Sequence, residues 1–317
     1  MSEIAIELAS DFGDAVIAGL SQPRKSIPAR YFYDVRGSEL FEEITRLPEY
    51  YPTRTETRLL KDHASDLERF AGRGRAVVEF GAGSAVKTPL LLDATHASTY
   101  VPIDISGEFL EASMAQLASI RPGLRILPVV DDFTQPLDLP PLEGPLMGFF
   151  PGSTIGNFDH RAAVDLLRSF RKTLGADARL VIGIDTRKNS RLLEAAYDDA
   201  AGVTAAFNVN LLHRINRELG GTIDVEAFDH RAVWHDGYGR IEMHLVANRD
   251  VAFSAAGRRF SMHMGETIHT ENSYKYTLQE ARLIGRASGW EPIAFWTDPD
   301  EMFGLHVWSA APDEPHP

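Results

Sequence analysis

The segment VEFGAGSAVKT, residues 78–88, constrains the fold of this chain more than any other segment. The apolar run before and within it, residues 76–80, predicts a short buried strand. Gly81-Ala82-Gly83 then allows the backbone to turn sharply, and a helix is expected from Lys87 onward. A strand, a glycine turn and a helix in this order are typical of the first unit of a nucleotide-binding α/β fold.

The glycine turn also restricts the class of ligand. Asp104 comes twenty-one residues after Gly83, at the end of a second predicted strand, where a carboxylate can accept hydrogen bonds from both ribose hydroxyls. Val86 stands where a dinucleotide fingerprint has its third glycine, and no G-K-[ST] ends the loop. The pattern therefore favours an adenosine ligand without a pyrophosphate, of which S-adenosylmethionine (SAM) is the commonest.

Composition excludes several classes of protein. The 317 residues suffice for one large domain or two ordinary ones, and the net charge of −13 without a Lys/Arg run argues against a nucleic-acid partner. The absence of cysteine excludes disulfides, thiolate nucleophiles and thiolate metal sites. Because the sequence has neither a long apolar run nor a basic, apolar leader, we expect a cytoplasmic monomer without membrane association.

Strands and helices alternate from residue 76 to residue 186, which predicts a parallel sheet with helices on both faces. The expected strands are 76–80, 99–103, 125–130, 145–150 and 179–184, with helices at 107–119 and 160–174. The segments 291–296 and 303–308 are expected to form an antiparallel hairpin that completes this sheet.

The regions outside the alternating segment have other patterns. Ser38 is expected to cap a helix over residues 38–47, and a second helix is expected over 55–71, after an irregular stretch. Residues 190–218 are predicted to be helical, and residues 230–266 to form antiparallel strands.

Functional side chains of a parallel sheet are expected at the C-terminal ends of its strands. Asp132 and Phe133 follow the third strand and could bind the amino group and the ring of an adenine. The alternative is a turn acid beside a core phenylalanine. Because these residues are in register with Asp104, the adenine site is favoured. Asn157 lies in a glycine-containing loop after the fourth strand and can hold an amine. A cap for the next helix explains that loop equally well, with Asp159 as the more obvious cap.

Other polar residues have simpler interpretations. Glu271 and Ser273 share one strand face, and an exposed polar strand accounts for both. Tyrosines such as Tyr33, Tyr50 and Tyr197 are more often core residues than catalytic ones. The histidines form no H-x-x-x-H or H-E-x-x-H pair, so they are interpreted as scattered surface residues and no metal site is predicted.

Several long motifs carry a family resemblance. They are RYFYDVRGSELFEEITRLPEYYPTRTE, VVEFGAGSAVKT, GSTIGNF, AAYDDAAGVTAAFNVNLL, RIEMHL and TENSYKYT. In this order, from about residue 22 to about residue 300, they resemble the SAM-dependent histidine Nα-methyltransferases of ergothioneine biosynthesis. The resemblance implies an α/β fold with a Rossmann-like class I SAM-dependent methyltransferase sheet, and a second, α+β domain that binds the substrate. The implied SAM-binding domain comprises residues 55–187 and 276–317, and the substrate-binding domain residues 1–54 and 188–275.

The resemblance also implies a role for each matching residue. The expected SAM contacts are Gly81, Lys87, Asp104 at the ribose, and Asp132 and Phe133 at the adenine. The expected histidine site consists of Tyr50, Asn157, Tyr197, Met243, Glu271 and Ser273. Asn157 and Tyr33 are expected beside the reacting amine, as the catalytic residues.

The implied reaction is the trimethylation of the α-amino group of L-histidine to hercynine, with SAM as methyl donor and no metal. Methyl transfer from a sulfonium needs a correctly placed neutral amine, so no strong general base is expected. One alternative is a related N-methyltransferase that acts on another amino acid or an indole-type amine. A second alternative is an NAD-dependent oxidoreductase, but the missing third glycine argues against it. A third is a non-catalytic protein with a SAM-binding fold, in which the polar cavity residues would have no role.

Overall fold

The computed structural model describes residues 3–83 and 86–311. Internal contacts divide the chain into two compact units. Unit 1 comprises Met1–Tyr50 and Asn189–Ser273, and unit 2 comprises Tyr51–Lys188 and Tyr274–Pro317. The chain therefore passes between the units three times, whereas the sequence predicts these passages after residues 54, 187 and 275.

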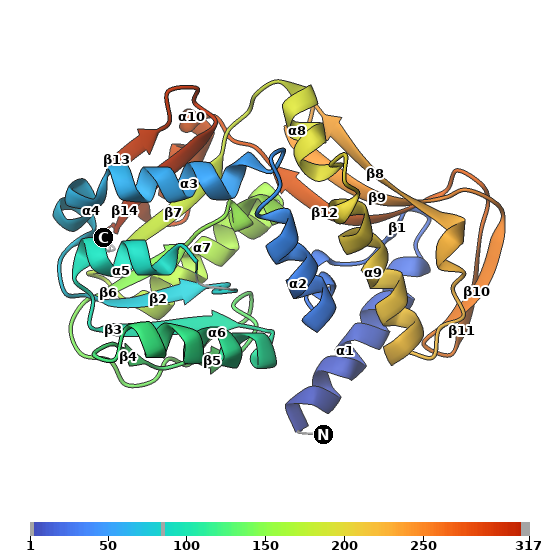
Figure 1. The fold of residues 1–317 in the computed structure, drawn as a ribbon, viewed down its shortest axis with the longest axis horizontal. Coiled ribbons are helices and arrows are strands. Elements are labelled where there is room, and N and C mark those ends of the chain that lie inside the picture. Colours follow the sequence, from blue (N-terminus) through green and yellow to red (C-terminus); the bar gives the residue numbers. More distant parts are fainter. Residues whose placement is uncertain (1–2, 84–85, 312–317) are drawn as a thin grey trace, which may run out of the picture. The chain divides into compact units, whose positions relative to one another are not determined.

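Unit 2 is built on one sheet with the strand order β13-β14-β7-β6-β2-β3-β4, and β5 also pairs with β3 (Figure 1). The strands are β2 (Ala76–Phe80), β3 (Thr99–Asp104), β4 (Arg125–Ile126), β5 (Val129–Val130), β6 (Leu146–Phe150), β7 (Arg179–Asp185), β13 (Trp290–Thr297) and β14 (Phe303–Ala310). β2, β3, β6 and β7 are parallel, and β14 runs antiparallel to both β7 and β13. The parallel sheet and its C-terminal hairpin are confirmed, although the strand predicted over 125–130 is two short strands.

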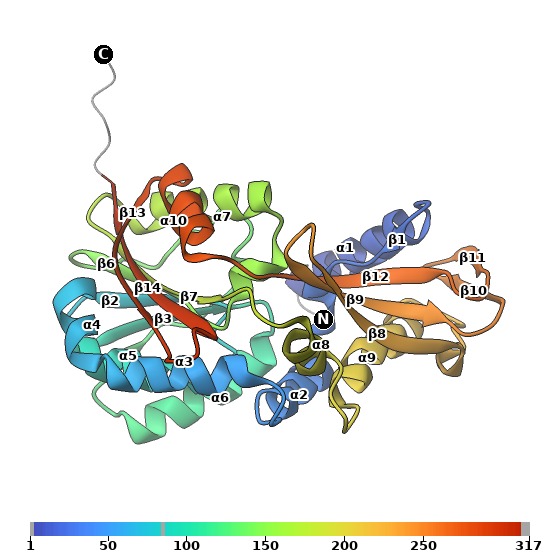
Figure 2. The ribbon, with the colours of Figure 1, turned by 90° about the horizontal axis from the view of Figure 1, so that it is seen from above.

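Helices cover both faces of this sheet (Figure 2). They are α3 (Tyr51–Asp62), α4 (Ala64–Ala71), α5 (Thr88–Thr95), α6 (Gly107–Ile120), α7 (His160–Leu174) and α10 (Leu278–Ala287). Neighbouring residues of β2 face opposite ways: Val77 packs into the core under α3 to α6, and Val78 into the core under α7 and α10. The sheet is therefore buried on both faces, which explains why its strands consist of continuous apolar residues.

Unit 1 is an α+β unit with a four-stranded sheet, β1-β12-β9-β8, and a separate hairpin, β10-β11. Its elements are α1 (Glu3–Leu20), β1 (Lys25–Ser26), η1 (Ala29–Phe32), α2 (Val35–Ile44), α8 (Ser190–Tyr197), α9 (Val203–Glu218), η3 (Val225–Ala227), β8 (Phe228–His235), β9 (Arg240–Ala247), β10 (Val251–Ala255), β11 (Arg258–Met262) and β12 (Thr267–Tyr274). Buried Asn208 fixes α9 to the sheet, because its Nδ2 donates to the carbonyl of His244 at 3.1 Å and its Oδ1 accepts from Thr270 at 2.8 Å.

Two predicted helix starts are wrong. The cap of α2 is Asp34 rather than Ser38, since its carboxylate accepts from the backbone N–H of Gly37 at 2.7 Å. α3 begins at Tyr51, in the stretch predicted to be irregular, because Pro52 fits the first turn, where its missing N–H costs nothing. The helices predicted over 55–71 and 190–218 are each divided into two.

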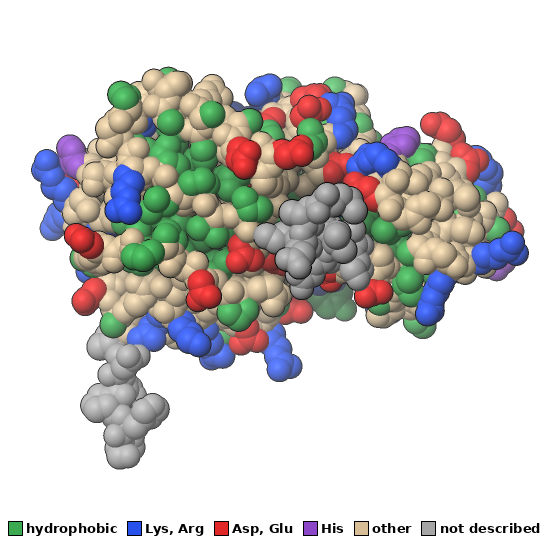
Figure 3. Space-filling model, turned by 90° about the horizontal axis from the view of Figure 1, so that it is seen from below, with side chains coloured by type: hydrophobic (Ala, Val, Ile, Leu, Met, Phe, Trp, Pro, Cys, Tyr) green, Lys and Arg blue, Asp and Glu red, His purple; other side chains and the backbone are tan. Residues whose placement is uncertain are grey.

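Charged and hydrophobic side chains share the surface of the protein. Figure 3 shows acidic and basic side chains spread over the same face, with hydrophobic side chains gathered between them. Within the described residues, no helix is both long enough and apolar enough to cross a membrane.

A buried ion cluster lies within unit 2, and its members include residues at or near the ends of the segments of this unit. Asp185, at the end of β7, accepts from the hydroxyl of Tyr51 at 2.8 Å, from Lys188 Nζ at 2.6 Å and from Lys275 Nζ at 2.7 Å. Burial favours the neutral acid, but the charges of Lys275 and Lys188 outweigh it and hold the pKa of Asp185 below its usual value. Burial lowers the pKa of Lys188 to about 8.

Gly183 of β7 is required by a close approach of α3. A Cβ at Gly183 would lie 2.0 Å from Oε1 of the buried Glu56 and 2.9 Å from the ring of Phe303. We expect Gly183→Ala to lower the free energy of unfolding by about 1–3 kcal/mol, because the added methyl group forces Glu56 out of its place. Urea denaturation followed by circular dichroism measures this loss. Gly123→Ala is the control, since no described atom lies within 4 Å of its Cβ position. Equal stability of the two variants would contradict the expectation.

Candidate functional site

The first part of the candidate site lies in unit 2, where the parallel strands end. Gly81 follows β2 with φ +77°, a conformation that favours glycine. A Cβ at Gly81 would approach the ring of Phe133 to 3.3 Å, and Phe133 packs edge-on against Phe150 with ring centroids 5.7 Å apart. The glycine therefore lets the backbone pass beside an aromatic ring that is fixed by the core.

Asp104 ends β3, as predicted. Its two oxygens accept from the backbone N–H groups of Gly83, at 3.0 Å, and Ser106, at 2.9 Å. Burial raises the pKa of Asp104, and the backbone N–H groups of Ser106, Gly83 and Ile105 act in the opposite direction. A carboxylate has about four lone-pair sites, so Asp104 keeps some capacity to accept a further hydrogen bond.

Lys87 lies opposite a carboxylate that the sequence prediction missed. Its Nζ donates to Oε2 of Glu56 at 2.5 Å, and the backbone N–H of Gly152 donates to the same oxygen at 2.9 Å. Glu56 is fully buried, although its segment, TRTETR, has the charged composition of an exposed helix. This arrangement places one positive and one negative group beside the loops after β2 and β6.

Two further predicted residues follow β5 and β6. Asp132 Oδ1 accepts from the backbone N–H of Thr134 at 2.9 Å and from its hydroxyl at 2.6 Å. Asn157 is the last residue of η2 (Thr154–Asn157) and is half-buried. The cap of α7 is Asp159, which accepts from the N–H of Ala162 at 2.8 Å, so helix capping does not account for Asn157.

The second part of the candidate site is a pocket within unit 1. It is lined by Phe41, Ile44, Tyr50, Ala196, Tyr197, Thr204, Phe207, Met243 and Glu271. Glu271 is the sole acid among these lining residues and is 9% exposed. Ser273 joins the pocket through Tyr197, since the two hydroxyls lie 2.7 Å apart. The interpretation of Glu271 and Ser273 as an exposed polar strand is therefore wrong, because α8 and α9 bury that face of β12.

Tyr33 lies behind the aromatic wall of this pocket. Its ring centroid is 5.8 Å from that of Phe41 and 5.9 Å from that of Phe207, and both partners line the pocket. Phe41 and Phe207 were missed by the sequence prediction, because apolar residues at helical spacing indicate a core as readily as a binding site.

The predicted residues thus fall into two groups. The first group, in unit 2, consists of Gly81, Lys87, Asp104, Asp132, Phe133 and Asn157. The second group, in unit 1, consists of Tyr33, Tyr50, Tyr197, Met243, Glu271 and Ser273. In unit 2 the structure brings Phe133 beside Gly81, and in unit 1 it brings Tyr50, Tyr197, Met243 and Glu271 to one pocket, to which Ser273 is joined.

The chain matches the family of histidine-specific, SAM-dependent methyltransferases over residues 12–310. It belongs to this family. It is 39% identical to the histidine N-alpha-methyltransferase of Mycolicibacterium smegmatis over 92% of each chain, and 38% identical to that of Mycobacterium tuberculosis, also over 92% of each. It is 33% identical to ergothioneine biosynthesis protein 1 of Neurospora crassa, covering 89% of this chain and 33% of that protein. The predicted family is confirmed, and the chain is a SAM-dependent methyltransferase rather than an oxidoreductase.

Glu79 of β2 is a buried acid beside the glycine turn. Its Oε2 accepts from the hydroxyls of Thr88 and Tyr100, each at 2.6 Å. Burial raises the pKa of Glu79 from its ordinary 4.5 to about 7, against the effect of these two donors. Between about pH 4.5 and about pH 7, the folded protein therefore holds a proton on Glu79 that the unfolded chain has released.

This difference in proton binding predicts a pH-dependent stability. As pH rises from about 4.5 to about 7, the folded state binds more protons than the unfolded state, so Glu79 makes stability fall. Glu79→Gln keeps the shape and stays neutral, so at pH 8 it should unfold with a free energy up to about 3 kcal/mol higher than wild type, with little difference at pH 4.5. Urea denaturation across this pH range, with the exposed Glu111→Gln as control, measures the effect. A parallel pH profile for wild type and Glu79→Gln would contradict it.

Proposed function

We propose that this chain methylates the α-amino group of L-histidine three times, forming hercynine in ergothioneine biosynthesis. The observation that carries the proposal is the pocket of unit 1, in which one buried carboxylate, Glu271, lies among aromatic and apolar side chains. The relatives from M. smegmatis and M. tuberculosis, both named histidine N-alpha-methyltransferases, support it.

Unit 2 is proposed to bind SAM, whose sulfonium supplies an activated methyl group. Asp104 accepts from the ribose, because its carboxylate ends β3 beside the glycine turn and keeps accepting capacity beyond its backbone donors. Phe133 packs against the adenine and Asp132 accepts from the adenine amino group. Lys87 is placed to pair with the carboxylate of the methionine end, and the buried Glu56 holds the Lys87 ammonium in position.

Unit 1 is proposed to bind the imidazole. Glu271 accepts from one ring N–H, the linked hydroxyls of Tyr197 and Ser273 bind polar ring atoms, and Met243 covers the ring face. Such a pocket disfavours a ring that lacks the matching polar groups, because that ring would displace water from the buried carboxylate without offering a hydrogen bond in return.

The amine itself needs orientation rather than a strong base. An α-amino group has a pKa of roughly 8, so a useful fraction is neutral near pH 7–8. Asn157 is proposed to orient this neutral nitrogen, since its amide can donate to or accept from it without protonating it. Tyr33 is proposed to form a wall of the space that receives the methylated amine.

An indole-type amine is the alternative substrate. The chain is 25% identical to the 4-dimethylallyltryptophan N-methyltransferase of Aspergillus fumigatus over 92% of each. An acidic group in the ring pocket favours the imidazole, which presents polar nitrogen on both sides of the ring, over the larger and less polar indole.

Product analysis tests the proposed reaction. With L-histidine and excess SAM, we expect mass spectrometry to show a product heavier by three methyl groups, with fragmentation placing all of them on the α-nitrogen. L-Tryptophan under the same conditions should give no product. Methylation on the ring, arrest after one methyl group or a preference for tryptophan would each refute the proposal.

The role of Glu271 is tested by binding. We expect Glu271→Ala to weaken histidine binding by about 5- to 150-fold, because a buried ring donor without its acceptor costs about 1–3 kcal/mol. The affinity for SAM should be unchanged, since the proposed SAM contacts lie in the other unit. Calorimetric titration of both ligands measures this, with the exposed Glu226→Ala of the same unit as control. Equal histidine affinity in wild type and Glu271→Ala would show that this carboxylate does not bind the ring.

A further inference from the structure

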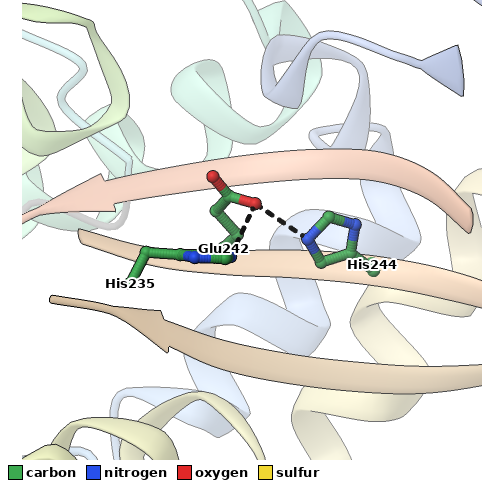
Figure 4. A group of neighbouring side chains, drawn as sticks. All are labelled: His235, Glu242 and His244. Carbon is green, nitrogen blue, oxygen red and sulfur yellow. Dashed lines mark hydrogen bonds and ion pairs between the residues drawn. The ribbon is translucent and has the colours of Figure 1, made fainter. Parts of the chain in front are cut away.

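Three potential metal ligands meet on the sheet of unit 1 (Figure 4). His235 ends β8, and Glu242 and His244 lie on β9. Oε2 of Glu242 is 3.2 Å from Nε2 of His235 and 3.0 Å from Nε2 of His244. One ligand atom from each of the three residues lies within 4.8 Å of the other two.

The register of the β8–β9 pair accounts for this cluster. Glu242 and His244 are two residues apart on one strand, so their side chains share a face. Val233 pairs with Glu242 and His235 with Arg240, which places His235 diagonally across from Glu242. A site assembled from two strands contains no H-x-x-x-H or H-E-x-x-H motif, so the sequence prediction of scattered histidines missed it.

We propose that His235, Glu242 and His244 bind a divalent transition-metal ion, with zinc as the best match. Two imidazoles and one carboxylate form a common three-ligand zinc site that leaves a coordination position open. Zinc–ligand bonds of about 2.0–2.2 Å in a tetrahedral site place neighbouring ligand atoms about 3.3 Å apart. The two distances from Glu242 already have this length, so only the imidazoles have to approach one another. The side chain of His235 is 41% exposed and has room to do so.

Arg240 determines which oxygen of the Glu242 carboxylate is available to a metal ion. Its Nε donates to Oε1 of Glu242 at 2.8 Å, and its Nη2 donates to the same oxygen. The guanidinium therefore holds one oxygen of Glu242 and leaves Oε2 directed at the two imidazoles. Its positive charge lowers the affinity for a dication, so removing that charge should tighten metal binding.

The proposed metal site lies on the face of the sheet opposite the substrate pocket. Met243, between the two ligands of β9, lines that pocket, and successive side chains of a strand point to opposite faces. The ion would therefore join β8 to β9 behind the pocket and take no part in methyl transfer. Zinc should raise the melting temperature, because it binds only the folded arrangement of the two strands, and a chelator should leave methylation of a saturating substrate unchanged.

The experiment uses untagged full-length protein, stripped with a chelator and titrated with zinc chloride in a calorimeter. We expect one zinc per chain in wild type, and at least tenfold weaker binding in His235→Ala and in His244→Ala. His263→Ala is the matched control, because His263 is also in unit 1 but its side chain is 84% exposed, outside the cluster. Arg240→Gln should bind zinc more tightly than wild type. Circular dichroism confirms that each variant is folded.

Cobalt provides an independent readout. Co²⁺ added in place of zinc should give a visible absorption band of a low-symmetry site in wild type and in His263→Ala, and none in His235→Ala. The proposal is overturned if wild type takes up no zinc, or if the cluster variants bind zinc as tightly as wild type. An equal loss of zinc binding in the His263→Ala control would also overturn it, because binding would then not depend on the cluster.

Discussion

The buried carboxylate of Asp185 is the constraint that holds together the ends of the segments of unit 2. A charge removed from water is costly unless partners compensate it inside the protein. Here the partners are Tyr51, Lys188 and Lys275, and each comes from a different one of the three places where the chain passes between the units. The need to neutralise one acid therefore fixes three separate chain segments at the end of β7.

The core of unit 2 could be predicted from the sequence because its signals are local. The apolar run of β2, the glycine turn after it and Asp104 at the end of β3 depend on residues that are neighbours along the chain. Helix starts were less predictable where two capping residues competed. Asp34 and Ser38 are both good caps, and the side-chain contact that decides between them is visible only in the folded chain.

The burial of polar residues could not be predicted, since it depends on packing between distant segments. Glu271 is in a polar stretch, and Glu56 is among basic residues, so each suggests an exposed side chain. Both are buried, Glu271 by helices from another part of unit 1 and Glu56 by contact with the loop after β6. The cluster of His235, Glu242 and His244 likewise depends on strand register, which no spacing along one strand reveals.

The second part of unit 1, Asn189–Ser273, is an insertion in unit 2. The chain leaves unit 2 before this insertion and returns to it afterwards at an adjacent point. Thr186 pairs with Tyr276 as an isolated parallel bridge, and the N–H of Tyr276 donates to the carbonyl of Asp185 at 3.0 Å. Because the ends of this insertion are held together by unit 2, changes in its length or sequence place little strain on the methyltransferase sheet. Such an arrangement lets the insertion diverge during evolution, and so acquire new pockets, while the machinery that handles the methyl donor is retained.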